Sequence, residues 1–451
     1  MLLNFKFKNL FSFKDMNTFS MVSGPVKRMG ERIYNDANNN VGVLKFSAIY
    51  GANAAGKSKF VDALLLMVKI VINGFKENMS NCYFKLDPAY ADEPSYLEVE
   101  LLLDGKVYAY GFTFLAKTSK LISEWLYELK GKREILIFNK DILTNKMETS
   151  IDPNNKSLME ALKVYKNEFK EKNDELFLSY LYGKEKLMDN INFLPIKSVC
   201  NWFLNCLDIT TPDTYATPID YYETSERLDE LSKLLSFFDT GITKIERVEC
   251  TFNEMTDGMI PSLVGRIQND LLEAEKKGIG FHAFLRGRLN MFLIDCKKEK
   301  KTFYKITFRH ECHNEIPFSS SDESEGTIRI LDLAEILLTK ASGKTFIVDE
   351  LDRCFHPQVT MKFISLFLEM AKTKNIQLIV TTHESRLLDF DILRRDEVWF
   401  VDKKKGISSI YSLEEYNDRF DKKIDKAYLE GRYGGVPVFD TVYPCLNDGQ
   451  N

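Results

Sequence analysis

The chain has 451 residues, which is long enough for two or three domains that each bury a core. Its formal net charge is −5, so the charge of the whole chain gives no general attraction to nucleic acid. The eight cysteines are scattered without a C-x-x-C pair, which indicates reduced thiols rather than a disulfide framework. No stretch has the pattern of a signal peptide or the length of a membrane span. We therefore expect a cytoplasmic protein that makes no contact with a membrane.

The N-terminal part leads to a glycine-rich loop. Two short strands are predicted at 2–7 and 16–22, and an apolar, β-rich run at 43–50 ends at Gly51-Ala52-Asn53-Ala54-Ala55-Gly56-Lys57-Ser58. This segment matches the phosphate-loop pattern G-x-x-x-x-G-K-[ST], and residues 60–71 continue with helical spacing. Glycines allow consecutive N–H groups to converge on phosphate oxygens at the N-terminus of a helix.

From this loop we predict the residues that contact ATP and Mg²⁺. Lys57 is expected to reach the β- and γ-phosphates, and Ser58 is expected to hold the magnesium ion. The expected ATP-binding residues of the loop are Asn53, Ala54, Ala55, Gly56, Lys57, Ser58 and Lys59.

After the loop, the pattern changes twice. Strands are predicted at 96–103, 106–114, 121–129 and 134–139, the first two joined across the hairpin signal Asp104-Gly105. Helical spacing then dominates at 157–170, 174–182, 187–207, 225–238 and 264–277, with strands at 242–252, 291–297 and 302–309. We therefore predict residues 1–150 as one half of an ATPase head, 151–290 as an inserted, mainly helical subdomain and 291–451 as the other half.

The last part alternates strands and helices. Ser324-Glu325-Gly326-Thr327 leads into a predicted helix at 328–340. A predicted strand at 345–350, helix at 357–372, strand at 376–383 and hairpin at 397–411 follow it. This alternation predicts a mostly parallel, doubly wound α/β core.

Two acids and a histidine stand at the ends of these strands. Hydrolysis by a phosphate-loop enzyme requires a metal ligand and a group that orients or deprotonates water. Asp349 is expected to hold magnesium through water, Glu350 to position the attacking water, and His383 to sense the γ-phosphate. An adjacent Asp-Glu pair in this place is typical of an ABC-type ATPase rather than a GTPase. A solvated strand end and a structural histidine are the alternatives.

Ser324 and Gly326 stand where an ABC-type ATPase carries its signature motif, although the residues differ from the usual signature sequence. Their hydroxyl and N–H groups are expected to contact the γ-phosphate bound by a second subunit. The active unit would then be a homodimer, or a higher homo-oligomer, that encloses ATP between two chains. The alternative is that Ser324 only caps its helix.

Taken together, these motifs resemble those of the AAA15 ATPases. These are the RloA-like, abortive-infection-type ATP-binding proteins, which are related to SMC, RecF and OLD-type ATPases. The segments that carry the resemblance are 50–58, 349–353 with His356-Pro357, 381–384, 393–400 and Gly431-Arg432-Tyr433-Gly434-Gly435-Val436-Pro437. The resemblance implies an ABC/SMC-type P-loop ATPase head with an antiparallel β subdomain and an inserted helical subdomain. Two departures stand out: Tyr83-Phe84-Lys85-Leu86-Asp87 occupies the region of the Q-loop glutamine, and no acidic nuclease segment follows residue 400.

The resemblance favours an ATPase of a bacterial anti-phage system that controls a separate effector, a nuclease or toxin encoded nearby. The alternative is a RecF/SMC-like DNA-repair ATPase. Lysine-rich turns at 297–301 and 403–405 leave contact with nucleic acid open, although solvated loops explain them better. A transporter nucleotide-binding domain is disfavoured by the long separation, 273 positions, from Gly51 to Ser324.

Overall fold

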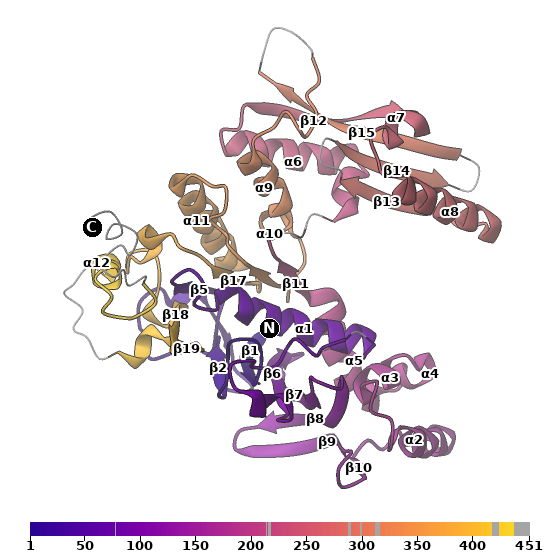
Figure 1. The fold of residues 1–451 in the computed structure, drawn as a ribbon, viewed down its shortest axis with the longest axis vertical. Helices are drawn as coiled ribbons and strands as arrows, with labels where there is room; N and C mark the ends of the chain where they lie inside the picture. Colours follow the sequence, from indigo (N-terminus) through magenta and orange to yellow (C-terminus); the bar gives the residue numbers. More distant parts are fainter. Residues whose placement is uncertain are drawn as a thin grey trace, which may run out of the picture. The chain divides into compact units, whose positions relative to one another are not determined.

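The computed structural model describes residues 1–76, 78–212, 214, 218–286, 290–297, 300–311, 316–416 and 424–436 (Figure 1). They divide into two compact units. The first contains the described residues of Met1–Pro212, Ala341–Asp352 and Phe363–Asn451, and the second those of Asp213–Lys340 and Arg353–Lys362. Within the described residues, no helix is both long enough and apolar enough to cross a membrane.

A six-stranded sheet forms the base of the first unit, in the order β11-β16-β17-β5-β18-β19. Its strands are β5 (Phe46–Gly51), β11 (Leu207–Thr210), β16 (Thr345–Val348), β17 (Gln377–Thr381), β18 (Val398–Lys404) and β19 (Ile407–Ser412). All neighbouring pairs are parallel except the hairpin β18–β19. The predicted parallel core is therefore confirmed. The central strands are apolar and buried, as strands covered on both faces must be.

The first unit also contains a seven-stranded antiparallel sheet, in the order β10-β9-β8-β7-β6-β1-β2. Its strands are β1 (Leu2–Lys8), β2 (Asn17–Ser20), β6 (Ser95–Leu103), β7 (Lys106–Leu115), β8 (Lys120–Lys130), β9 (Arg133–Asp141) and β10 (Lys146–Thr149). The hairpin predicted across Asp104-Gly105 is confirmed, since Leu103 pairs with Lys106. A small pair, β3 (Ile33–Asp36) and β4 (Val41–Leu44), precedes β5.

Helix α1 (Lys57–Asn73) joins both sheets in one hydrophobic core. Its Phe60 ring lies 5.1 Å from the ring of Phe19 and 5.9 Å from the rings of Phe5 and Phe7, all on the antiparallel sheet. Edge-to-face pairs at these separations add to the stability that burial of the rings already provides. The helix that begins at the phosphate loop is thus anchored on its buried face.

A buried glutamine connects β1 and β4 to the parallel sheet. Gln377, at the start of β17, accepts a hydrogen bond from the N–H of Leu2 at 2.7 Å. Its amide nitrogen donates to the carbonyls of Leu2 at 2.9 Å and Leu44 at 3.0 Å. Because a buried amide is costly when unpaired, these bonds hold β1 and β4 against the parallel sheet.

The structure changes the predicted limits of the inserted subdomain, which were 151–290. Helices α2 (Lys156–Phe169), α3 (Phe177–Tyr182), α4 (Glu185–Met188) and α5 (Leu194–Asn201) belong to the first unit, followed by the π-helical turn Trp202–Cys206. Their large apolar side chains, such as Phe177 and Trp202, are completely buried in the core of that unit. The next residues form β11, an unpredicted strand of the parallel sheet.

The second unit therefore begins near residue 213, and it combines helices with a sheet. Strands β12 (Ile242–Cys250), β13 (Phe281–Arg286), β14 (Met291–Lys297) and β15 (Lys300–His310) form an antiparallel sheet in the order β12-β15-β14-β13. Its helices are α6 (Ser225–Phe237), α7 (Phe252–Thr256), α8 (Pro261–Lys277), α9 (Glu325–Asp332) and α10 (Ala334–Leu338). The predicted helix at 328–340 is divided in two at Leu333. Helix α11 (Pro357–Thr373) has residues in both units.

One buried carboxyl makes stability depend on pH. Glu397 is fully buried, and burial raises the pKa of its side chain to about 8. One carboxyl oxygen accepts the N–H of Arg394 at 2.8 Å, and the other has no hydrogen-bond partner among the described residues. The folded protein therefore keeps a proton here that the unfolded chain releases above its ordinary pKa of 4.5.

We predict that Glu397→Gln stabilises the protein at pH 8.5 but not at pH 4.5. Between the two pKa values the folded state binds more protons than the unfolded chain. The free energy of unfolding therefore falls as the pH rises, by up to about 1.4 kcal/mol per pH unit. A neutral amide avoids this loss. Urea unfolding followed by circular dichroism at both pH values measures the effect, with Glu31→Gln, an exposed carboxyl, as control. An equal difference between wild type and variant at both pH values would contradict the prediction.

Candidate functional site

The phosphate loop connects β5 directly to α1. Gly56 has φ +122°, and a side chain there would meet the Ser408 hydroxyl at 2.7 Å, so the position requires glycine. Ala54 also has a positive φ, of 61°. Among the described residues, no side chain caps the N-terminus of α1, and the first turn of this helix contains no acidic residue. The N–H groups of the first turn are therefore available for an anion, and the helix dipole favours one.

Lys57 lies inside this loop. Its side chain is buried, and its ammonium donates to the carbonyls of Gly51 at 2.8 Å and Ala52 at 3.2 Å. Burial lowers the pKa of Lys57 to about 8, while the negative charges of Asp349, Asp352 and Glu350 oppose that change. A cation held only by backbone carbonyls can be transferred to phosphate oxygens, which are stronger acceptors because they are charged.

The hairpin β18–β19 supports the loop from the side. The Ser408 hydroxyl donates to the carbonyl of Ala55 at 2.6 Å and lies 2.8 Å from the hydroxyl of Ser12. Lys403 donates to the carbonyl of Ala54 at 3.3 Å. The carbonyls of the loop are thereby tied outward, which helps to keep its N–H groups free.

Asp349 and Glu350 follow β16 and are held by one hydroxyl. Thr381, at the end of β17, donates to the Asp349 carboxylate at 2.6 Å and accepts the N–H of Glu350 at 2.8 Å. Asp349 is buried, whereas Glu350 is half-buried and has a φ of 50°. This left-handed conformation costs about 1–2 kcal/mol in a residue with a side chain. The backbone thus turns sharply between the two acids.

His383 is the next predicted site residue along the chain. Its N–H lies 3.2 Å from both carboxylate oxygens of Asp352, which fixes the backbone of the histidine against the segment after Glu350. Partial burial lowers the pKa of His383, and the positive charge of Lys57 lowers it further. These effects favour a neutral imidazole near pH 7.

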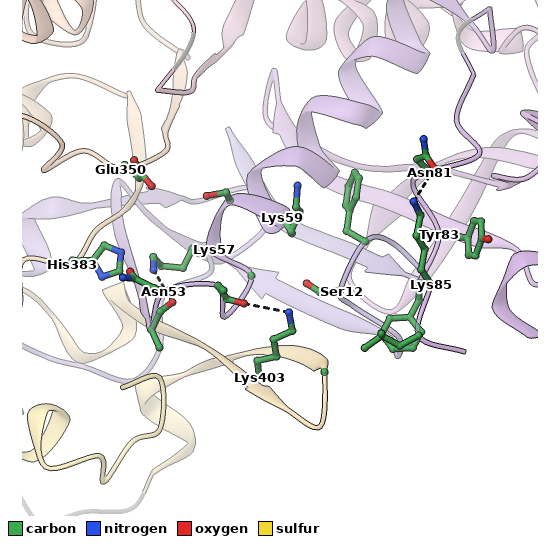
Figure 2. Close-up of a pocket in the computed structure, with 18 residues that line it drawn as sticks. Ser12, Asn53, Lys57, Lys59, Asn81, Tyr83, Lys85, Glu350, His383 and Lys403 are labelled. Atoms are coloured by element: carbon green, nitrogen blue, oxygen red, sulfur yellow. Dashed lines mark hydrogen bonds between the residues drawn. The ribbon is translucent and has the colours of Figure 1, made fainter. Parts of the chain in front are cut away.

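These residues surround one cavity of about 950 Å³. Figure 2 shows Lys57, Asn53, His383 and Glu350 at one end of it. At the other end, Figure 2 shows Asn81, Tyr83 and Lys85 with Ser12 between the two groups. The cavity thus extends well beyond the phosphate loop, as the size of a nucleoside triphosphate requires.

The structure brings most of the predicted site residues together. The predicted site residues that line the cavity are Asn53, Ala54, Gly56, Lys57, Ser58, Lys59, Glu350 and His383. Ala55 is buried and its carbonyl accepts the Ser408 hydroxyl, and Asp349 directly precedes Glu350 after the end of β16. Ser324 and Gly326 lie in the second unit. Ser324 is the N-cap of α9, accepting the N–H of Thr327 at 3.0 Å, and Gly326 is in the first turn.

The donor atoms fit a magnesium ion. Ser58 offers a hydroxyl at the start of α1, and Asp349 offers a carboxylate whose orientation Thr381 fixes. Mg²⁺ prefers such oxygen ligands and completes its octahedron with water and substrate phosphates. Ser58 and Asp349 are therefore the residues of this chain that would hold it.

The comparisons agree with this geometry. A family model described as "AAA domain, putative AbiEii toxin, Type IV TA system" matches residues 46–157 and 220–389, more than half of the chain. The chain belongs to this AAA-domain family. The matched segments include the phosphate loop, both acids and His383. A nucleotide-binding phosphate-loop fold is thus established on sequence and geometry together. A search of curated proteins found no match.

Solved structures similar to this AAA-domain protein are heads of SMC proteins. The SmcHead bound to the C-winged helix domain of ScpA has 13% identity and a TM-score of 0.41, over 92% of this chain and 98% of that one. The SMC head domain from Thermotoga maritima has 14% identity and a TM-score of 0.37, over 91% of this chain and 98% of that one. The Smc head domain with an extended coiled coil, bound to the C-terminal domain of ScpA derived from Pyrococcus furiosus, has 12% identity and a TM-score of 0.38. The match covers 96% of this chain and 99% of that one.

Sequence reasoning assigned no role to several residues of this site. The two functions of the Thr381 hydroxyl depend on the neighbouring strand, 32 residues earlier in the chain. Ser12 and Ser408 approach the loop from segments 396 residues apart. Two segments that line the cavity stood out in the sequence: residues 83–86, in the region of the Q-loop glutamine, and the lysine-rich turn that begins at Lys403.

We predict that Thr381→Val lowers ATP turnover about 10- to 100-fold, because Asp349 and the Glu350 backbone lose the hydroxyl that positions them. It should also cost about 1–3 kcal/mol of stability, since a buried carboxylate loses a donor. Steady-state ATPase rates and urea unfolding measure the two effects. Thr345→Val is the matched control, because its buried hydroxyl bonds only Gln377, at the other end of the sheet. Equal turnover in the two variants would contradict the prediction.

Proposed function

We propose that this protein is an ABC-type ATPase that binds ATP with Mg²⁺ and hydrolyses it to ADP and phosphate. The observation that carries the proposal is the convergence of Lys57, Glu350 and His383 on one cavity, with Asp349 beside them. These are the groups that phosphoryl transfer needs: a cation at the phosphates, a metal ligand and a group that orients water.

In this proposal each group has its own role in hydrolysis. Lys57 leaves the carbonyls of Gly51 and Ala52 and binds the β- and γ-phosphates, together with the N–H groups of the first turn of α1. A Mg²⁺ ion held by Ser58 and Asp349 would supply positive charge that stabilises the charge developing on the phosphates. Glu350 orients the attacking water, and neutral His383 donates a hydrogen bond to the γ-phosphate.

The proposal further includes a homodimer closed by ATP. Ser324 and Gly326 of one chain would contact the γ-phosphate bound by Lys57 of the other. The support is the position of Ser324 at the N-terminus of α9, an end to which the helix dipole attracts anions. The Ser324 hydroxyl is hydrogen-bonded to the N–H and the hydroxyl of Thr327 in its own helix. In the closed dimer these bonds would have to rearrange; if they do not, Ser324 has a structural role only.

The biological role we propose is control of a separate effector in a bacterial anti-phage system, with the chain as an RloA-like member of the AAA15 group. The family description, which names a putative toxin and a type IV toxin–antitoxin system, supports a defence context. ATP binding and hydrolysis would supply the two states that switch the effector.

We predict that Lys57→Ala abolishes ATP binding, because it removes the cation of the loop. Glu350→Gln should retain binding and lose turnover, accumulating as an ATP-bound dimer. Equilibrium binding of a fluorescent ATP analogue, phosphate release and size-exclusion chromatography measure these outcomes. Wild-type hydrolysis by Glu350→Gln would show that Glu350 does not orient the water.

The Lys57→Ala variant also tests the biological proposal. A host that carries the gene with its neighbours should resist phage, and Lys57→Ala should remove that resistance in a plaque assay. Full protection by this gene alone would argue against a separate effector.

We predict that Ser324→Arg blocks ATP-dependent dimerisation, since it places a bulky cation where the γ-phosphate of the other chain would dock. Mixing Ser324→Arg with Lys57→Ala chains should restore part of the ATPase activity. In such a mixed dimer, one composite site carries both changes and the other carries neither. If Ser324 is only a helix cap, its replacement costs about 1 kcal/mol of stability and leaves hydrolysis intact, and mixing restores nothing.

A further inference from the structure

The glycine-rich segment Gly431–Pro437 has no part in the function proposed above. Its described residues, with the preceding helix α12 (Ile424–Leu429), pack against the phosphate-loop strand; Pro437 lies outside the described residues. Tyr428 and Tyr433 are both 5% exposed, although they are close to the end of the described chain. Something in the first unit must therefore bury them.

The two tyrosines pack on the end of the parallel sheet. The Tyr428 ring lies 5.5 Å from Phe400 on β18 and 5.8 Å from Tyr50, the residue before Gly51. Tyr433 stacks on Phe400 at 5.6 Å. Burial raises the pKa of Tyr428 to about 12, and the backbone N–H of Gly51 opposes this rise. The Gly51 N–H must therefore lie close to the Tyr428 hydroxyl.

Gly435 brings the backbone of this segment against the phosphate loop. A side chain on Gly435 would have its Cβ 3.3 Å from the Cα of Gly51 and 3.4 Å from the carbonyl oxygen of Val401. The φ of Gly435 is +68°, a conformation that other residues seldom adopt. Its carbonyl accepts the Tyr428 hydroxyl at 3.1 Å, and its N–H lies 3.4 Å from Asp402.

Gly51 has little freedom to yield. A Cβ at Gly51 would lie 2.5 Å from the Val401 carbonyl oxygen. The Gly51 carbonyl is also one of the two acceptors that hold Lys57. A displacement of Gly51 therefore moves the strand end from which the loop begins and the acceptor that holds its lysine. Helix α12 packs as well against the short helix Ser385–Leu387, two residues after His383.

From these contacts we infer that Tyr428 and Gly435 are positioning residues for the nucleotide: they hold Gly51, and with it the phosphate loop, in the conformation that binds phosphates. The inference rests on the proposed ATP binding. It assigns a purpose to the glycine-rich segment, because a residue with a Cβ at position 435 would be strained at a φ of +68° and would crowd the Cα of Gly51 at 3.3 Å.

The test compares two alanine variants of the full-length protein. Gly435→Ala should weaken binding of both ATP and inorganic tripolyphosphate about tenfold, because the affected contacts are those to phosphate. Gly431→Ala is the matched control: Gly431 has a similar φ of +77°, but its added Cβ would meet only the side chain of Val436, at 3.1 Å. It should bind both ligands as the wild type does, after an equal cost in thermal stability.

A second pair of variants applies even if the alanine variants fail to fold. Tyr428→Phe keeps the ring and loses the bond to Gly435, so it should weaken tripolyphosphate binding two- to threefold, whereas Tyr428→Leu should weaken it about tenfold. Wild-type affinity in both Gly435→Ala and Tyr428→Leu, or in Tyr428→Leu alone where the alanine variants do not fold, would overturn the inference. Failure of the wild type itself to bind ATP would instead refute the proposed function, and Lys57→Ala provides the reference for absent binding.

Discussion

The register of three parallel strands determines where the chemistry of this protein is located. Val380 on β17 is level with Val348 on β16 and with Ala48 on β5. One residue further, Asp349 and Thr381 are side by side, which is why a single hydroxyl can bond the carboxylate and the next backbone N–H. Parallel strands present their carboxyl ends at one edge, so loops that are far apart in the chain meet there. A shift of one residue would turn Asp349 and Thr381 to opposite faces.

Many hydrogen bonds of the site are made within the chain and hold the backbone of its loops. Ser408 and Lys403 bind carbonyls of the loop, and Asp352 binds the backbone of His383. Such contacts fix backbone direction before a ligand arrives, and preorganised donors lower the cost of binding a charged group. The same logic applies to the left-handed conformation of Glu350, whose cost the hydrogen bond to Thr381 helps to offset.

Local patterns predicted the elements that carry the site, because the phosphate loop and the acid pair end apolar strands. They could not reveal contacts between distant segments, such as that of Ser12 with Ser408. They also misplaced the inserted unit: residues 187–207 have helical spacing throughout, and the four residues of β11 that follow are too few to show a period of their own. For Ser324, the pattern suits a helix cap and a phosphate contact equally, since both use the N-terminus of a helix.

The strand order also has a consequence for how the chain folds. Strand β5 ends at Gly51, yet its two neighbours are β17 and β18, which begin at Gln377 and Val398. During synthesis, the phosphate loop therefore has no strand partner until more than three hundred further residues have been made. Pairings of such sequence separation form slowly, and an unpaired apolar strand is prone to aggregation. The nascent chain must keep β5 covered during this interval, and the antiparallel sheet with α1, complete by about residue 150, is the part of the core that is synthesised early enough to do so.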